Sequence, residues 1–151
     1  MQKINLVKAI VRHTPVNFTR NFVQGAPDRK NSVRYLLLKK AEDKFFPENI
    51  GKWEFVGGVI KPRETSKEAI AREMKEETGL EGKIVRKLPT LKSDKSICEV
   101  YLINANSMDV KTSAENSDYR WLKAEDIKKQ DLVLYASLLL EFFNNPEKYL
   151  N

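Results

Sequence analysis

Residues 57–80, GGVIKPRETSKEAIAREMKEETGL, constrain the fold of this chain more than any other segment. They begin with a double glycine that breaks the apolar run KWEFVGGVI, which has the composition of a strand. Thr65 or Ser66 can then cap a helix, and Glu68 occupies the matching position of a capping box. The segment therefore predicts a strand, a turn and then a helix over about residues 65–78.

Three glutamates share one face of this helix, although the chain as a whole is basic. Glu73, Glu76 and Glu77 occupy positions i, i+3 and i+4, which are neighbours on a helical surface. Ile70 and Met74 line the adjacent flank and are expected to pack inward, which places the carboxylates at the border of the core. Like charges at this spacing destabilise a helix unless a cation lies among them.

A hard divalent cation would relieve the repulsion among these carboxylates. Such a cation prefers oxygen ligands, bridges phosphate oxygens and lowers the pKa of a bound water. The pattern therefore indicates a magnesium site for phosphate chemistry. The alternative is an acidic, solvated helix whose charges are balanced by helical neighbours, and Lys67, Glu68 and Lys75 partly support it.

The spacing of the whole segment resembles the Nudix box. Residues 58–80 run from Gly58 over five positions to Glu64, and over seven more to REMKEETGL, which fills every position that the box specifies. WEF before the double glycine is similar to the MutT-like branch, with Val56 where that branch has proline. The resemblance implies an α+β Nudix fold, a mixed β-sheet sandwiched between α-helices, as a single domain over residues 1–151.

The resemblance also implies roles for residues within the box. The metal ligands it implies for Mg²⁺ (or Mn²⁺) are the backbone carbonyl of Gly58 and the carboxylates of Glu73, Glu76 and Glu77. Glu64 and Arg72 would face each other, either as a purely architectural ion pair or as support for the metal cluster. Gly57 and Gly79 would support the site structurally, and Gly79 would end the helix.

Substrate-binding candidates lie outside the box. Lys39 and Lys40 end a predicted strand where the family often places basic residues near phosphates, with a solvated strand end as the alternative. Asp131 stands near the position at which MutT-like enzymes read the nucleobase, with the N-cap of a late helix as the alternative. Trp53 would belong to the core or to the pocket wall, where it could contact the substrate.

One further glutamate completes the predicted catalytic set. Glu115 lies six residues before Trp121, the relation in which MutT-like enzymes carry a metal-binding or base-positioning glutamate. The resemblance implies in-line attack of water on a phosphorus of the substrate, with Glu73, Glu76, Glu77 and Glu115 as the catalytic carboxylates. It leaves open whether Glu73, Glu77 or Glu115 accepts the proton, and how many metal ions bind.

The rest of the chain alternates between strand-like runs and turns. Strands are expected at residues 4–13 and 33–40, in GKIVRKLPTL and SICEVYLINA, and around Trp121; a largely buried helix is expected at residues 131–143. Residues 14–32 carry prolines, a glycine and other turn formers, and predict a long loop or a hairpin near VNFTRNFV.

Composition narrows the function classes. A net charge of +6 and a pI near 9.3 suit an anionic ligand, but charge alone would fit nucleic acid equally well. Cys98 and His13 are the only residues of their types, so neither an internal disulfide nor a Cys/His catalytic pair is expected. The absence of an apolar run of about 20 residues or of a secretory signal predicts a cytoplasmic protein without a membrane partner.

The expected activity is that of a MutT-like nucleoside triphosphate pyrophosphohydrolase acting on ordinary or oxidised nucleotides. ADP-ribose hydrolases of the family tend to carry proline where this chain has Lys95. Past the box, dinucleoside polyphosphate hydrolases tend to carry a tyrosine a few residues earlier than Tyr101, the first tyrosine that follows the box in this chain. Both remain alternatives, as do a non-catalytic nucleotide-binding module and an RNA-directed hydrolase. We expect a small-molecule nucleotide substrate and no nucleic-acid partner, and the oligomeric state stays open, with a homodimer among the alternatives.

Overall fold

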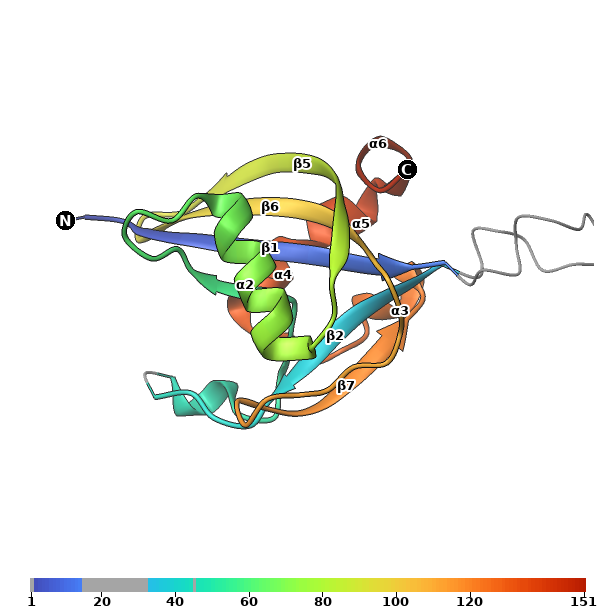
Figure 1. Ribbon diagram of the computed structural model, residues 1–151, viewed down its shortest axis with the longest axis horizontal. Coiled ribbons are helices and arrows are strands. Elements are labelled where there is room, and N and C mark those ends of the chain that lie inside the picture. Colours follow the sequence, from blue (N-terminus) through green and yellow to red (C-terminus); the bar gives the residue numbers. More distant parts are fainter. Residues whose placement is uncertain (1, 15–32, 45) are drawn as a thin grey trace, which may run out of the picture.

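The computed structural model describes residues 2–14, 33–44 and 46–151. Within these residues, seven strands form one mixed sheet with helices on both faces (Figure 1). The elements are β1 (Ile4–His13), β2 (Arg34–Lys40), η2 (Pro47–Asn49), β3 (Trp53–Glu54), β4 (Val56–Val59), α2 (Ser66–Thr78), β5 (Gly82–Lys92), β6 (Ser96–Ala105), β7 (Asn116–Leu122), α3 (Ala124–Ile127), α4 (Leu134–Leu138), α5 (Leu140–Asn144) and α6 (Pro146–Tyr149). The loop or hairpin predicted at residues 14–32 lies outside the described residues from residue 15 onward.

Strand β1 is the centre of the sheet. It pairs in parallel with β6 and antiparallel with both β2 and β4. β4 follows the first half of β1, where Leu6 faces Val59, whereas β2 pairs with Arg12 and His13 at the far end. Because β2 then continues beside β3 and β7, the sheet divides along β1 into two branches.

The sheet buries apolar side chains on both of its faces. Val7 of β1 packs in one cluster with Ile70 of α2. Ile10, three residues further along the same strand, packs on the opposite face in a cluster with Ile127 of α3 and Phe142 of α5. Successive side chains of a strand alternate between faces, so one strand serves both clusters. The predicted α+β arrangement, a mixed sheet between helices, is confirmed.

Helix α2 begins and ends where the sequence predicts. The N–H of Glu68 donates to Oγ1 of Thr65 (3.1 Å), and the Glu68 carboxylate accepts from the N–H of Thr65 (3.2 Å), which completes the capping box. Gly79 closes the helix with a φ of 71°, a left-handed conformation that glycine adopts without a steric penalty.

The capping box gives a direct test of helix stability. We expect Thr65→Ala to lower the free energy of unfolding by about 1 kcal/mol, because the N–H of Glu68 loses its acceptor. For a chain of this length that corresponds to a fall of roughly 2–4 °C in Tm. Thr65→Ser keeps the hydroxyl and serves as the control. Equal losses for the two variants in thermal unfolding would show that the hydroxyl is not what stabilises the helix.

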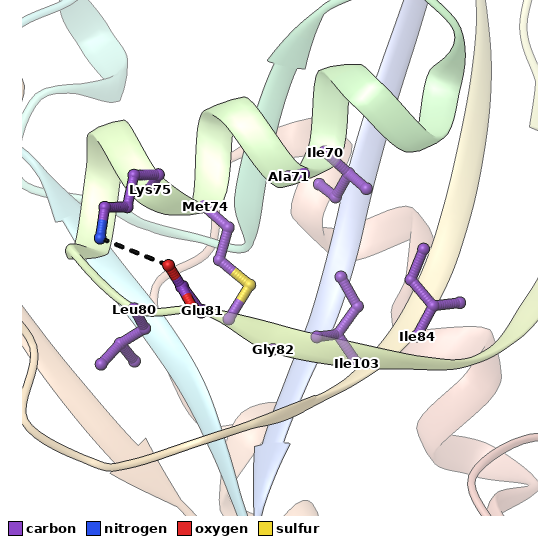
Figure 2. A pocket seen from close by; sticks show the side chains of 9 residues that line it. All are labelled: Ile70, Ala71, Met74, Lys75, Leu80, Glu81, Gly82, Ile84 and Ile103. Atoms are coloured by element: carbon purple, nitrogen blue, oxygen red, sulfur yellow. Dashed lines mark ion pairs between the residues drawn. The ribbon is translucent and has the colours of Figure 1, made fainter.

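The apolar flank of α2 packs over β5 and β6 (Figure 2). Ile70 and Met74 are buried, as predicted, and Met74 lies in the same cluster as Ile103 of β6. A cavity of about 420 Å³ remains between helix and strands, and its lining is mostly aliphatic, with the Lys75–Glu81 ion pair at one end. The helix therefore turns its apolar side to the strands and leaves its glutamates to another part of the surface.

The sequence predicts that the apolar run KWEFVGGVI breaks at the double glycine. In the structure the run breaks at Phe55 instead. β3 ends at Glu54, β4 begins at Val56, and Gly57 and Gly58 both lie inside β4. β3 pairs with β2, whereas β4 pairs with β1. The chain therefore passes from one branch of the sheet to the other at Phe55, whose side chain is fully buried.

The prediction of a single, largely buried helix at residues 131–143 is wrong. Two short helices, α4 and α5, stand there, and Leu134 at the start of α4 is 74 % exposed. The preceding residues are held extended against β3. The N–H of Trp53 donates to the carbonyl of Asp131 (2.8 Å), and the N–H of Val133 donates to the carbonyl of Trp53 (3.0 Å). The N-cap of α4 is accordingly Val133, and the alternative that Asp131 caps the helix is also wrong.

The single cysteine and the single histidine both lie on strands of the sheet. Cys98 is buried on β6, and burial raises the pKa of its thiol to about 11, which disfavours the reactive thiolate. His13 lies at the end of β1 with its ring edge-on to Trp121, at a centroid distance of 6.2 Å. Among the described residues, every helix is too short or too polar to cross a membrane.

Candidate active site

A cavity of about 490 Å³ opens between α2 and the neighbouring strands. Most of the side chains around it are charged. The acidic ones are Glu42, Asp43, Glu54, Glu73, Glu76, Glu77 and Glu115, the basic ones are Lys8, Lys40 and Lys44, and Gly57, Gly58 and Val59 complete the wall. The cavity thus brings together the three α2 glutamates, the double glycine, Lys40 and Glu115, which are far apart in sequence and were each selected from sequence alone.

The three α2 glutamates differ in their exposure to solvent. The side chain of Glu76 is 57 % exposed and that of Glu73 is 14 % exposed. Glu77 is buried, and its Oε2 has no hydrogen-bond partner in the described structure. The acidic face of the helix is therefore exposed at Glu76 and buried at Glu77, where one carboxylate oxygen has no partner.

Burial raises the pKa of Glu77 well above its ordinary value. The ammonium of Lys8 opposes this shift, while the nearby carboxylates of Glu54 and Glu73 add to it. Without a further cation, the ionised form of Glu77 is therefore held at a cost.

Arg72 connects the helix to the loop before it. Its guanidinium donates to both carboxylate oxygens of Glu64, at 2.7 and 3.0 Å, and to the backbone carbonyl of Val59 at 3.3 Å. Its Nη1 donates to Glu73 at 2.9 Å and to Glu76 at 3.3 Å. The pKa of Glu64 is lowered to about 2, mainly by the hydrogen bond from Arg72 and to a lesser extent by the hydrogen bond from the N–H of Lys61. The expected ion pair is thus present, and it also orients two of the three cavity glutamates.

The double glycine makes room for two side chains of opposite charge. A Cβ atom on Gly57 would lie 2.1 Å from the carbonyl oxygen of Val7 and 2.7 Å from Cδ of Lys8. A Cβ atom on Gly58 would lie 2.6 Å from Oε1 of Glu73. Gly57 also has a φ of 149°, which side-chain-bearing residues rarely adopt. β4 therefore approaches β1 and α2 more closely than any residue other than glycine allows.

Five charged residues of the cavity were not among the candidates selected from the sequence, namely Lys8, Glu42, Asp43, Lys44 and Glu54, and of these Lys8 and Glu54 are the most buried. The Nζ of Lys8 donates to the carbonyl of Phe55 (3.3 Å) and lies 3.7 Å from Oε2 of Glu54. The same Oε2 accepts from Nζ of Lys40 at 3.3 Å, and Lys40 also pairs with Asp43 at 3.5 Å. The available signal was a lone charge inside each of two apolar runs, INLVKAIV and KWEFV.

Three of the four predicted substrate-binding residues lie outside this cavity. Neighbouring side chains on a strand point to opposite faces, so Lys39 points to the face of β2 opposite that of Lys40. Its Nζ lies 5.8 Å from the ring centroid of Trp53. The guanidinium of Arg120 covers that ring at 4.3 Å, and Trp53 itself is 5 % exposed. Asp131 is exposed and meets Trp53 through its backbone. Only Lys40 of this group lines the cavity.

Glu115 reaches the cavity from the turn before β7. Its carbonyl accepts from the N–H of Ala41 (2.8 Å), and its own N–H donates to Oγ of Ser113 (3.3 Å). The first of these hydrogen bonds fixes the turn against the end of β2, and the second lies within the turn. Trp121 is half-buried on β7, and its Nε1 donates to the carbonyl of Met108 (3.0 Å), which is a structural contact.

The oxygen donors of the cavity fit a hard divalent cation. As they stand, no three His, Cys, Asp or Glu side chains of the described residues converge closely enough to hold a metal ion. Arg72 occupies the facing oxygens of Glu73 and Glu76, while Oε2 of Glu77 is buried without a partner. A cation would satisfy that oxygen, and carboxylate oxygens are the ligands that Mg²⁺ and Mn²⁺ favour.

Comparison with known proteins places the chain in a family. The family model of the NUDIX domain matches residues 22–141. The chain is 36 % identical over 120 residues to the nucleoside triphosphatase NudI of Escherichia coli O81, an alignment that covers 68 % of this chain and 82 % of the relative. The NudI of Klebsiella pneumoniae matches with the same identity and coverage.

Solved structures agree with this assignment. The crystal structure of a MutT protein from Methanosarcina mazei superposes with a TM-score of 0.65 at 26 % identity, over 98 % of this chain and 99 % of that chain. The NUDIX domain of Shewanella oneidensis NrtR, solved with ADP ribose, gives a TM-score of 0.70 at 17 % identity, over 97 % and 90 % of the two chains. At that identity the second likeness concerns the fold alone.

An acidic helix laid over a mixed sheet, beside a cavity of mixed charge, fits a hydrolase that acts on phosphate compounds. The chain belongs to the Nudix family. It is accordingly a Nudix hydrolase, and enzymes of this family generally need a divalent metal ion.

Proposed function

We propose that this Nudix hydrolase is a nucleoside triphosphate pyrophosphohydrolase, which converts an NTP or dNTP, in ordinary or oxidised form, into a nucleoside monophosphate and pyrophosphate. The carrying observation is that one cavity combines the glutamates of α2 with two lysines on the facing strands. The identity of the chain to relatives that are named nucleoside triphosphatases supports the triphosphate as substrate.

The residues that would hold the metal are the carboxylates of Glu73, Glu76 and Glu77 and the backbone carbonyl of Gly58. We propose Mg²⁺, with Mn²⁺ as a substitute, because the donors are all oxygens. When bound, the ion neutralises phosphate oxygens and lowers the pKa of water.

The protein's own side chains would position the substrate and move one proton. Lys40, on the wall that faces α2, would bind oxygens of the triphosphate. Arg72 would hold the α2 carboxylates ready, since it already donates to Glu73 and Glu76. A carboxylate among Glu73, Glu77 and Glu115 would accept the proton of the attacking water. Water adds to phosphorus, the bridging P–O bond breaks, and pyrophosphate leaves with the bond's electron pair.

A release assay separates this function from its alternatives. We expect dNTPs or NTPs with Mg²⁺ to yield equal amounts of monophosphate and pyrophosphate, and no activity in excess EDTA. The same assay should include ADP-ribose, diadenosine tetraphosphate and capped RNA. Faster turnover of any of these than of every triphosphate, or release of orthophosphate in place of pyrophosphate, would contradict the proposal.

We also propose that residues 1–151 form a single domain, which one cooperative unfolding transition would support.

A further inference from the structure

Lys8 is a buried ammonium on the central strand of the sheet. It is 9 % exposed, and its neighbours in sequence, Val7 and Ala9, are fully buried apolar residues. A buried lysine is costly unless it is paired. Its partners are the carbonyl of Phe55 at 3.3 Å and Oε2 of Glu54 at 3.7 Å.

The fold gives up a side chain to make space for Lys8. If residue 57 carried a Cβ atom, that atom would lie only 2.7 Å from Cδ of Lys8, which is too close for any residue other than glycine. Gly57 therefore lets the lysine stem run beneath β4 toward the cavity, of which Lys8 forms part of the wall.

The ammonium stands among carboxylates, of which Glu54 also pairs with Lys40 and Glu73 with Arg72. Burial lowers the pKa of Lys8, yet the nearby acidic groups, first Glu54 and then Glu77, Cys98 and Glu73, raise it above its ordinary value. Lys8 is also the cation that favours the ionised form of Glu77, whose Oε2 lacks a hydrogen-bond partner. Of the other two lysines around the cavity, Lys40 and Lys44, the first pairs with Glu54 and Asp43.

We propose that the Lys8 ammonium is a resident cation of the acidic cavity. It neutralises, in the metal-free enzyme, part of the carboxylate charge that the divalent ion neutralises in the working enzyme. It is a positioning residue that holds the carboxylates together before metal arrives and, by repulsion, lowers the affinity of the cavity for metal. The inference rests on the proposed function, because it takes the α2 glutamates as the metal ligands.

Removing this charge should therefore strengthen metal binding. Lys8→Met keeps the length of the stem, and Lys8→Gln keeps a hydrogen bond to the Phe55 carbonyl within reach. For both we expect the Mn²⁺ dissociation constant, measured by calorimetry without nucleotide, to be roughly three- to tenfold lower than in the wild type. The metal-free variants should melt roughly 5–10 °C lower, because Glu54 and Glu77 lose a cation. Saturating Mn²⁺ should remove at least half of that difference.

Two controls separate charge from packing and from net charge. Lys8→Arg keeps the charge and should bind Mn²⁺ within twofold of the wild type. Lys87→Met, at a half-exposed lysine of β5 that pairs with Glu99 of β6, makes the same change in net charge and should also stay within twofold. A purely structural lysine would give neutral variants that bind Mn²⁺ as weakly as the wild type or more weakly, and this result would overturn the proposal. Tighter binding by Lys8→Arg would overturn it as well. If the wild type takes up no Mn²⁺, or if Glu77→Gln binds it unchanged, the proposed metal site itself is wrong.

Discussion

The Glu77→Gln variant should lose turnover by on the order of 1,000- to 100,000-fold with its fold intact. Glutamine has the shape of glutamate but lacks the charge with which Glu77 would hold the metal. The unpartnered Oε2 of Glu77 marks this carboxylate as the α2 glutamate with the most to gain from a cation. The measurement is kcat at saturating triphosphate and Mg²⁺, with circular dichroism to verify the fold.

Stability should respond in the opposite direction to activity. Glu77 is buried, and burial raises its pKa well above the ordinary value, so its ionised form is costly in the metal-free protein. A neutral amide removes that cost, and we expect metal-free Glu77→Gln to melt at or above the wild-type Tm. Added Mn²⁺ should then stabilise the wild type more than the variant.

Glu81→Gln provides the matched control. Glu81 follows α2 and is 78 % exposed, with a weak ion pair to Lys75 at 3.8 Å. Its change should leave kcat within twofold and Tm within about 1 °C of the wild type. Turnover by Glu77→Gln at a rate close to that of Glu81→Gln would refute the assignment of Glu77 as a metal ligand.

The parts of the site that sequence could predict are those determined within a few residues of each other. Thr65 caps α2, Gly79 ends it, and Arg72 meets Glu64, as expected, because helix geometry and a short loop fix these relations. Ile70 is buried for the same reason, since the helical period places it on the flank that faces the sheet.

The parts that sequence could not predict depend on strand pairing over long distances. Lys8 and Glu54 meet because β1 pairs with β4 while β3 pairs with β2, and nothing near either residue encodes that division of the sheet. The late helix was misplaced for a similar reason, since Asp131 and Val133 bond to the backbone of Trp53, far back in the chain. Periodicity alone favoured a continuous helix there, and tertiary hydrogen bonds override it.

The two glycines of β4 should differ sharply when each is replaced by alanine. For Gly57→Ala, the new methyl group would lie 2.1 Å from the carbonyl oxygen of Val7, an atom of the paired strand that cannot rotate away. The φ of 149° adds strain. We expect the free energy of unfolding to fall by roughly 3–5 kcal/mol, measured by urea denaturation, which is a large part of the stability of an ordinary domain.

For Gly58→Ala the nearest atom is Oε1 of Glu73, at 2.6 Å, at the end of a side chain that can turn aside. We therefore expect a stability loss of about 1 kcal/mol or less, together with a fall in turnover of roughly 10- to 100-fold as Glu73 is displaced from the cavity. The adjacent substitutions thus separate the two functions of the double glycine, close strand pairing at Gly57 and room for a carboxylate at Gly58. If Gly58→Ala hydrolysed triphosphate at the wild-type rate, Glu73 would not need the position in which the structure holds it, and its place among the metal ligands would be lost.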